Sequence, residues 1–97
     1  MDIPELLTRG GYIIFNKIIA NKLGRNVAIY LGELCSESVY WENNNKLEND
    51  YFYSTMKNVY KNTGLSRFQQ DKCRNILLEE RIIEIKKRRK QYNLLQN

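Results

Sequence analysis

The chain contains no histidine and only two cysteines among its 97 residues. The lack of histidine excludes Ser-His and Cys-His nucleophilic catalysis as well as zinc sites of the Cys₂His₂ type. Cys35 and Cys73 are too far apart for a CxxC redox pair, and two thiolates cannot fill a four-cysteine metal site. Both cysteines lie among apolar residues at helical spacing. We therefore expect two small core residues in a reducing cytoplasm.

Long apolar runs and phosphate-binding loops are also missing. The longest apolar stretch, from Tyr12 to Ala20, is interrupted by Asn16 and Lys17 and is too short to span a bilayer. The signal-peptide pattern of a basic start followed by an apolar run is absent, and no GxxxxGK loop occurs. We therefore expect a cytoplasmic protein without a membrane partner.

The acidic residues do not form a pattern that would suit catalysis. Glu79 and Glu80 are adjacent on a predicted helix and so point in different directions, while Glu48 and Asp50 fall in a polar loop. These are typical of ordinary surface charges. We expect no catalytic residue, no metal, no cofactor and no small-molecule substrate, and hence a protein that is not an enzyme.

What the chain does contain is a basic excess, and this excess is confined to the last third. Residues 1–66 carry seven basic and seven acidic residues, whereas residues 67–97 carry nine basic and four acidic ones, which accounts for the net charge of +5. Five of the nine are consecutive, from Lys86 to Lys90. Such a block favours a polyanionic partner through phosphate neutralisation and counterion release. The alternative is a solvated tail, which the apolar residues on both sides of the block disfavour.

Length and composition predict one globular domain over residues 1–97, because hydrophobic residues make up 42% of the chain and charged residues 28%. Residues 12–23 have helical spacing, and Gly24 provides a stop. A second helix is predicted over residues 26–41, with Asn26 as its N-cap. One face of that helix carries Val27, Leu31, Leu34, Cys35 and Ser38. The asparagine-rich stretch 42–50 predicts a loop.

A short strand and two further helices are predicted next. Residues 51–53 are aromatic and bounded by polar residues, which favours a strand. Ser54 can cap a third helix that ends at Gly64, with an apolar stripe of Met56, Val59 and Tyr60. Ser66 and Gln69 form a capping box that opens a fourth helix. The buried stripe of that helix is expected to be Leu65, Cys73, Ile76 and Leu77, with Gln70 or Arg74 half-covered at its edge.

The remaining residues alternate between apolar and polar. Residues 83–86 and 92–94 follow this period, which predicts two antiparallel strands joined by the basic run. The turn lacks Gly, Asn and Pro, so a helix continuing over residues 76–96 is the alternative, and the isoleucines oppose it only by a few tenths of a kcal/mol each. The predicted fold class is α+β, mainly α. It has about four helices, a short strand near 51–53, a helix-turn-helix at about 54–80 and a hairpin wing at about 82–96.

This order of elements predicts a winged helix-turn-helix that binds double-stranded DNA. The second helix of such a motif lies in the major groove, so its outward face needs hydrogen-bonding side chains. Arg67 can read guanine and Gln69 can read adenine with two hydrogen bonds each. Phe68 either touches a thymine methyl group or packs against the wing. The predicted DNA contacts on this helix are Ser66, Arg67, Phe68, Gln69, Gln70, Lys72 and Asn75. The wing adds Lys86, Lys87, Arg88, Arg89 and Lys90, which contact phosphates or enter the minor groove.

Several stretches of the chain resemble winged-helix domains of phage and plasmid origin. These stretches are residues 11–14, 23–31, 51–55 and 63–70 and the pattern Leu77-x-Glu79-x-x-Ile82-Ile83-Glu84. The most specific of them is Thr-Gly-Leu-Ser-Arg-x-Gln-Gln over residues 63–70. Some of the similar domains begin replication initiator or replisome-organiser proteins, and others are small phage regulators. The resemblance therefore implies a role in DNA replication or transcription, either as an N-terminal domain or as a stand-alone regulator. Arg81 departs from the family pattern, which usually has glycine there, and a non-glycine residue at positive φ costs roughly 1 kcal/mol.

The alternative function is a winged helix that binds protein rather than DNA, either as a replisome scaffold or as an inhibitor of a nucleic-acid enzyme. Its interface would be an aromatic patch of Tyr40, Trp41, Tyr51 and Tyr53. Aromatic residues are enriched in interface hot spots, although they equally often close a small core around a short strand. A replication protein and a second copy of the chain are further candidate partners.

Overall fold

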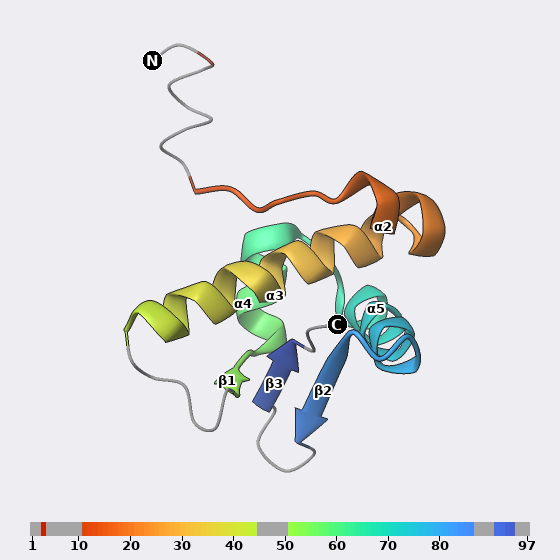
Figure 1. Cartoon of the computed structure of the whole chain (residues 1–97). Coiled ribbons are helices and arrows are strands. Elements are labelled where there is room, and N and C mark those ends of the chain that lie inside the picture. The colour runs from red at the N-terminus through yellow and green to blue at the C-terminus, as the bar shows by residue number, and fades with distance from the viewer. Residues whose placement is uncertain (1–2, 4–10, 45–50, 87–90, 95–97) are drawn as a thin grey trace.

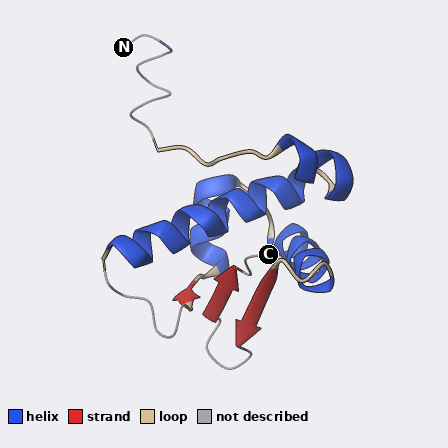
Figure 2. Cartoon of the chain, in the orientation of Figure 1, coloured by secondary structure: helices blue, strands red, loops and turns tan. Residues whose placement is uncertain are grey.

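The computed structural model describes residues 3, 11–44, 51–86 and 91–94. These residues form four helices and a small three-stranded antiparallel sheet (Figures 1 and 2). The helices are α2 (Lys17–Leu23), α3 (Arg25–Asn43), α4 (Met56–Thr63) and α5 (Arg67–Glu79), and the strands are β1 (Phe52–Tyr53), β2 (Ile83–Lys86) and β3 (Gln91–Leu94). The predicted class, α+β and mainly helical, is confirmed.

Strand β3 lies at the centre of the sheet, between β1 and β2. Tyr92 on β3 pairs with Phe52 on one side and with Ile85 on the other. The predicted hairpin is confirmed, and a helix continuing to residue 96 is wrong. The chain leaves α5 through Arg81, whose φ of 57° is left-handed, and the Ile82 amide then donates to the Leu77 carbonyl at 2.9 Å. This exit ends the helix as a Schellman motif does.

The hydrophobic core lies between the long helix α3, the sheet and the pair α4–α5 (Figure 1). Its buried members come from every one of these elements: Val27, Tyr30, Leu34, Phe52, Val59, Leu65, Cys73, Leu77, Ile83 and Tyr92. Complete burial of each large side chain contributes about 1.5–3 kcal/mol. Ile83 and Tyr92 anchor the hairpin in this core, and Ile85 and Leu94 pack against it, as the alternating pattern predicted.

The local stop and start signals at the glycines and at Ser66 are confirmed. Gly24 ends α2 with φ of 108°, and Gly64 ends α4 in the left-handed conformation with φ of 78°. Ser66 caps α5, and both hydrogen bonds of the capping box with Gln69 are present. Glycine adopts such backbone angles without the steric cost that a Cβ atom would add.

The first helix is shorter than predicted. It begins at Lys17 rather than at residue 12, because the Asn16 side chain accepts a hydrogen bond from the Ile19 amide at 2.9 Å and so caps the helix. Residues 11–16 are not helical. The backbone carbonyl of Ile14 lies against α3 at Gly32, where a Cβ atom would collide with it. Ile14 and Ile18 are exposed rather than packed, with exposed fractions of 74% and 64%.

The caps of the two following helices also differ from prediction. Helix α3 begins one residue before Asn26, with Gly24 as its N-cap, because this glycine both ends α2 and starts α3. At α4 the cap is Thr55, whose hydroxyl accepts from the Asn58 amide, whereas Ser54 is buried. Tyr60 does not join the buried stripe but is 60% exposed, and Val59 is the buried residue of α4. Helix α3 extends to Asn43, and Cys35 is only half-buried.

A pair of carboxyl groups lies at the edge of this core. Glu33 is only 3% exposed, and its Oε2 accepts a hydrogen bond from Asn62 Nδ2 of α4 at 2.9 Å. Glu37 lies one turn further along α3. Burial, reinforced by a hydrogen bond with Glu33, raises the pKa of Glu37 from 4.5 to about 8. The folded protein therefore binds the Glu37 proton more tightly than the unfolded chain does.

Folding stability is expected to fall as the pH rises from 4.5 to about 8, because the stabilisation that Glu37 contributes is complete below pH 4.5 and is lost as its carboxyl ionises in the folded state. The slope from this group is less than about 1.4 kcal/mol per pH unit, because Glu37 is partly exposed to solvent. Urea unfolding of the wild type and of Glu37→Gln at about pH 5 and about pH 8 measures the effect. The variant should lose less stability over this interval, and an identical loss in both proteins would contradict the prediction.

Candidate nucleic-acid interface

Helices α4 and α5 are joined by a short turn that is held by side chains as well as by backbone geometry. Gly64 turns the chain in the left-handed conformation, and its amide donates to the Tyr60 carbonyl at 2.8 Å. The Thr63 hydroxyl donates to the Val59 carbonyl at 2.6 Å and accepts from the Leu65 amide at 3.1 Å. These bonds fix the turn so that α5 starts at a defined angle to α4.

Gln70 connects the two helices from the inside. It is 1% exposed, and its Nε2 donates to the Leu65 carbonyl at 2.9 Å and to the Met56 carbonyl at 3.1 Å. The Leu65 carbonyl lies in the turn between the helices, and Met56 is the first residue of α4. The prediction of Gln70 as a DNA contact is therefore wrong, because its amide is used to hold α4 and α5 together in the interior.

The outward face of α5 carries most of the predicted DNA contacts. Its exposed members are Arg67, Phe68, Gln69, Lys72 and Asn75, while Ser66 at the cap is half-covered. The structure therefore brings these five side chains to one solvent-facing surface, opposite the buried residues Cys73 and Leu77. Four of the five, all but Phe68, carry polar side chains of the kinds that can read base edges in the major groove.

Gln69 also belongs to the N-terminal cap of α5, a role that can conflict with its predicted contact to a base. Its Oε1 accepts from the Ser66 amide at 2.9 Å, while the Ser66 hydroxyl accepts from the Gln69 amide at 3.2 Å. Reading adenine with two hydrogen bonds uses both the oxygen and the nitrogen of a Gln amide. In this structure the oxygen already serves the helix cap, so this reading would compete with the capping box.

Phe68 is 70% exposed, so the structure does not support the alternative in which it packs against the hairpin. Instead the Lys72 ammonium lies 5.5 Å from the centre of the Phe68 ring, within the range of a cation–π contact. The pair joins consecutive turns of α5 on its outer face. A phenyl ring held in this way is available to contact an apolar group such as a thymine methyl.

Arg74, predicted only at the edge of the buried stripe, holds the hairpin against α5. Its Nε donates to the Tyr92 hydroxyl of β3 at 3.1 Å, and its Nη1 forms an ion pair with Asp71 at 2.7 Å. The Tyr92 ring in turn lies near Tyr30 of α3, whose pKa is raised above its ordinary value by burial and by Tyr92. The spacing of Asp71 and Arg74 by three residues indicates a helical ion pair, but not the contact with β3.

The basic residues predicted for the hairpin are described only in part. Lys86 ends β2 and pairs with Gln91 at the start of β3. The predicted contacts Lys87, Arg88, Arg89 and Lys90 lie outside the described residues. Their contribution to the interface therefore stays a prediction from the sequence.

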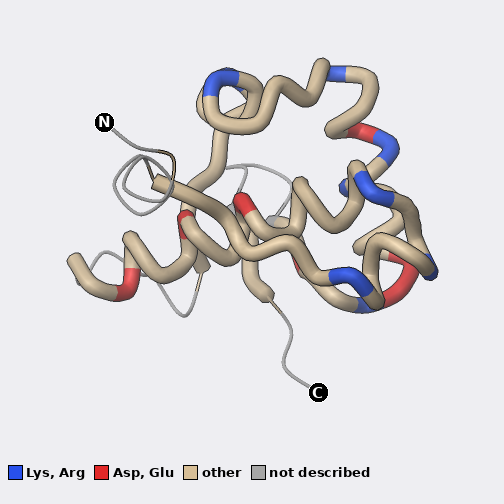
Figure 3. The backbone as a smooth tube through the Cα atoms, turned by 90° about the horizontal axis from the view of Figure 1, so that it is seen from above, with Lys and Arg blue, Asp and Glu red and all other residues tan. Residues whose placement is uncertain are grey.

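Charged residues are distributed unevenly over the described part of the fold. After Arg25, helix α3 carries the acidic residues Glu33, Glu37 and Glu42 and no Lys or Arg. Figure 3 shows red positions along this helix and blue positions spread over the other segments. After Arg25, helix α3 is therefore acidic, whereas α5 carries charges of both signs.

Within residues 11–44, 51–86 and 91–94 there is no group of three His, Cys, Asp or Glu side chains that could hold a metal ion. None of the helices described is long and apolar enough to pass through a membrane. Comparison with protein-family models, with curated proteins and with solved structures finds no match to this chain.

Proposed function

We propose that the chain is a non-catalytic winged helix-turn-helix domain that binds double-stranded DNA, in phage or plasmid replication initiation or in the regulation of transcription. The observation that carries the proposal is the solvent-facing surface of α5, which presents Arg67, Gln69, Lys72 and Asn75 directly after a tight turn from α4. The order of α4, turn, α5 and antiparallel hairpin is the order of a helix-turn-helix followed by a wing.

In this arrangement α5 lies in the major groove, and the hairpin that Arg74 holds against it follows the adjoining backbone. Arg67, in the first turn of α5, reads a base edge, and Lys72 contacts a phosphate or a base. The basic run after β2 supplies sequence-independent affinity by neutralising phosphates. The role in replication or transcription rests on the resemblance of the sequence to phage and plasmid domains.

The direct test of the proposal is a gel-shift titration with a random 30-base-pair duplex at two salt concentrations, about 50 and about 200 mM. Binding through phosphates must weaken steeply with salt, because each contact releases condensed counterions. A selection from a random duplex library then supplies a preferred site. Absence of binding to either duplex at low salt would overturn the proposal.

Replacing Arg67 with alanine is expected to weaken binding to the selected site by about 1–3 kcal/mol and to weaken binding to random DNA much less. The reason is that a base contact is formed only with the correct base, whereas a phosphate contact is formed with every sequence. Lys61→Ala serves as the matched control, since Lys61 is an exposed cation on α4 rather than on α5. Equal losses on both duplexes would show that Arg67 contacts only phosphate.

The second candidate function, binding of a protein instead of DNA, has some support from the aromatic patch. Trp41 and Tyr53 contact each other with ring centres 5.4 Å apart, and Tyr40 is 56% exposed. Tyr51 also donates to Glu84 of β2 at 2.9 Å, so part of the patch holds β1 against the hairpin. The salt titration separates the two functions, because a protein-binding domain without DNA affinity would not shift the duplex.

A further inference from the structure

A second concave surface lies along α3, away from the outward face of α5. Five residues of α3 share one side of the helix at the spacing i, i+3, i+4, i+7, i+8, namely Glu33, Ser36, Glu37, Tyr40 and Trp41. They line a hollow of about 360 Å³, whose opposite wall consists of Tyr53, Thr55, Asn58 and Asn62. The volume is within the range of small ligand sites. This stripe of α3 is therefore acidic and aromatic where a core stripe would be aliphatic.

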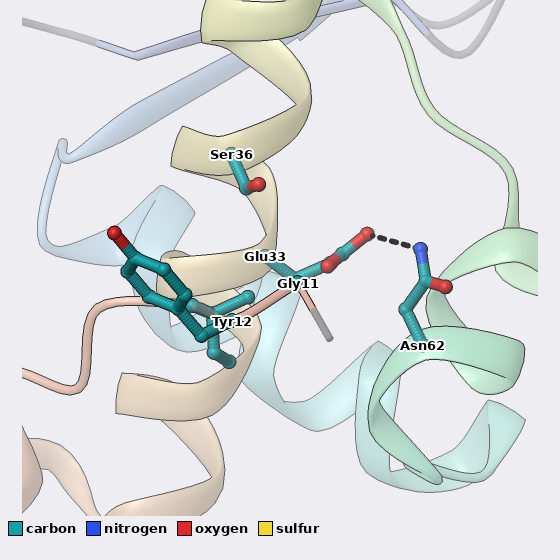
Figure 4. Close-up of a pocket in the computed structure, with 6 residues that line it drawn as sticks. Gly11, Tyr12, Glu33, Ser36 and Asn62 are labelled. Carbon is teal, nitrogen blue, oxygen red and sulfur yellow. Dashed lines mark hydrogen bonds between the residues drawn. The ribbon is translucent and has the colours of Figure 1, made fainter. Parts of the chain in front are cut away.

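The carboxyl groups of this hollow are held in position, and one of them is incompletely bonded. Glu33 is almost completely buried and accepts from Asn62 across the gap between α3 and α4 (Figure 4). The Glu37 carboxyl forms a hydrogen bond with Glu33, but its buried Oε2 has no hydrogen-bond partner among the described residues. Buried polar atoms without a partner are rare in folded proteins. A donor that enters the hollow would satisfy this oxygen.

The remaining walls favour a donor that carries positive charge. Trp41 and Tyr53 meet at 5.4 Å with their planes inclined by 45°, which leaves aromatic surface beside the carboxyl groups. Aromatic faces attract ammonium and guanidinium groups. Trp41 also lies in the last turn of α3, where the helix dipole is negative. No Lys or Arg lines this hollow in the described part of the chain, so the Glu37 carboxyl has no internal counter-ion there once it ionises above about pH 8.

The hollow continues into a second one, which gives a ligand room to extend. This neighbour has a volume of about 460 Å³ and shares Glu33, Ser36 and Asn62 with the first. Gly11 and Tyr12 also line it, from a segment that lies beside α3 in Figure 4. The two hollows form a groove along α3, hereafter the α3 groove. Glu33 lines both hollows, whereas Glu37 lines only the first.

We propose that the α3 groove binds a basic segment of a partner protein, with one Arg or Lys side chain inserted between Glu33, Glu37 and the aromatic pair Trp41–Tyr53. Charge complementarity selects this occupant. The inserted cation donates to the unpaired Glu37 oxygen and packs on the rings, and the flanking backbone occupies the neighbouring hollow. The groove shares no residue with the outward face of α5, so this inference does not depend on DNA binding, and both surfaces can be occupied at once.

The fluorescence of Trp41, the only tryptophan in the chain, reports directly on this site. The probes are blocked peptides of about seven residues with a central Arg, Lys or citrulline, titrated at about pH 8.5, where Glu37 is ionised because its pKa is about 8. The Arg and Lys peptides should produce a saturable change, and the neutral citrulline peptide should not. Glu37→Gln should weaken binding of the Arg peptide by about tenfold or more. Glu42→Gln, on the same helix but outside the groove, should change its affinity by less than about twofold.

A second variant keeps the test decisive if Glu37→Gln fails to fold. Ser36→Arg places a tethered cation in the groove from a position already open to solvent, and it should abolish peptide binding while the circular dichroism spectrum is retained. An equal response to the citrulline peptide, or unchanged affinity in Glu37→Gln and Ser36→Arg, would overturn the proposal. The proposal would also be overturned if free arginine amide bound as tightly as the Arg peptide, because the groove would then be a site for a small cation. If the wild-type protein self-associates and either variant abolishes this, the occupant of the α3 groove is a second copy of the chain and not a partner protein, and the proposal is overturned.

Discussion

Replacing Gln70 with alanine is expected to lower the free energy of unfolding by about 3 kcal/mol, a large share of the 5–15 kcal/mol that is typical of a small domain. The buried amide donates to Met56 and Leu65, so its removal leaves two interior carbonyl groups without this donor and opens a cavity between α4 and α5. Urea unfolding followed by circular dichroism measures the change.

Gln69→Ala is the matched control for this prediction, because it removes the same side chain from the adjacent, exposed position. It loses only its half of the capping box and should cost about 0.5–1 kcal/mol. Gln70→Met separates the two contributions, since it nearly preserves the volume and removes the donor. If Gln70→Ala and Gln69→Ala proved equally stable, Gln70 would not be the connection between the two helices.

Neutralising Lys87, Arg88 and Arg89 together is expected to weaken binding to all duplex DNA alike and to reduce the slope of log affinity against log salt by about three. The net charge of +5 arises entirely after residue 66, and these residues belong to its densest run. Because Ile83 and Tyr92 anchor the hairpin in the core, the charges can be removed with little change in the melting temperature. Affinity measured at several salt concentrations, together with thermal unfolding, gives both quantities.

The control for the hairpin variant removes the same amount of charge at the other end of the fold. Lys17, Lys22 and Arg25 are exposed on α2 and at the start of α3. Neutralising them changes the overall field but no contact of the proposed interface, so the salt slope should change by less than one. Equal effects of the two triple variants would mean that net charge alone drives binding, and the assignment of the wing would then be wrong.

Much of the fold could be predicted from short stretches of sequence. Gly24 and Gly64 end helices because of their own backbone freedom, and the Ser66–Gln69 capping box involves groups only three residues apart. The alternation around Ile83 and Tyr92 predicted the hairpin, because a strand with one buried face has a period of two. The exposed face of α5 could be predicted in the same way once its buried stripe was recognised.

Predictions failed where competing local signals were resolved by more distant parts of the chain. Residues 12–16 have helical spacing, but the Asn16 cap and the close approach of Ile14 to Gly32 place them outside the helix. Ser54 and Thr55 are both acceptable caps, and Thr55 takes the role because Ser54 is buried and interacts with Glu37 of α3. Such outcomes depend on which distant part of the chain packs against each residue. The residues within one helical turn do not contain this information.

By itself, the sequence determined the class of the fold, the positions of its turns and the location of its positive charge, because each depends on neighbouring residues or on simple counting. The tertiary structure alone decided the roles of Gln70, Arg74 and Glu33. Gln70 finds Met56 at a separation of 14 residues, Arg74 finds Tyr92 at 18, and Glu33 finds Asn62 at 29. A polar side chain becomes an internal connection, a support for the hairpin or part of a groove only when folding brings its distant partner within hydrogen-bonding distance.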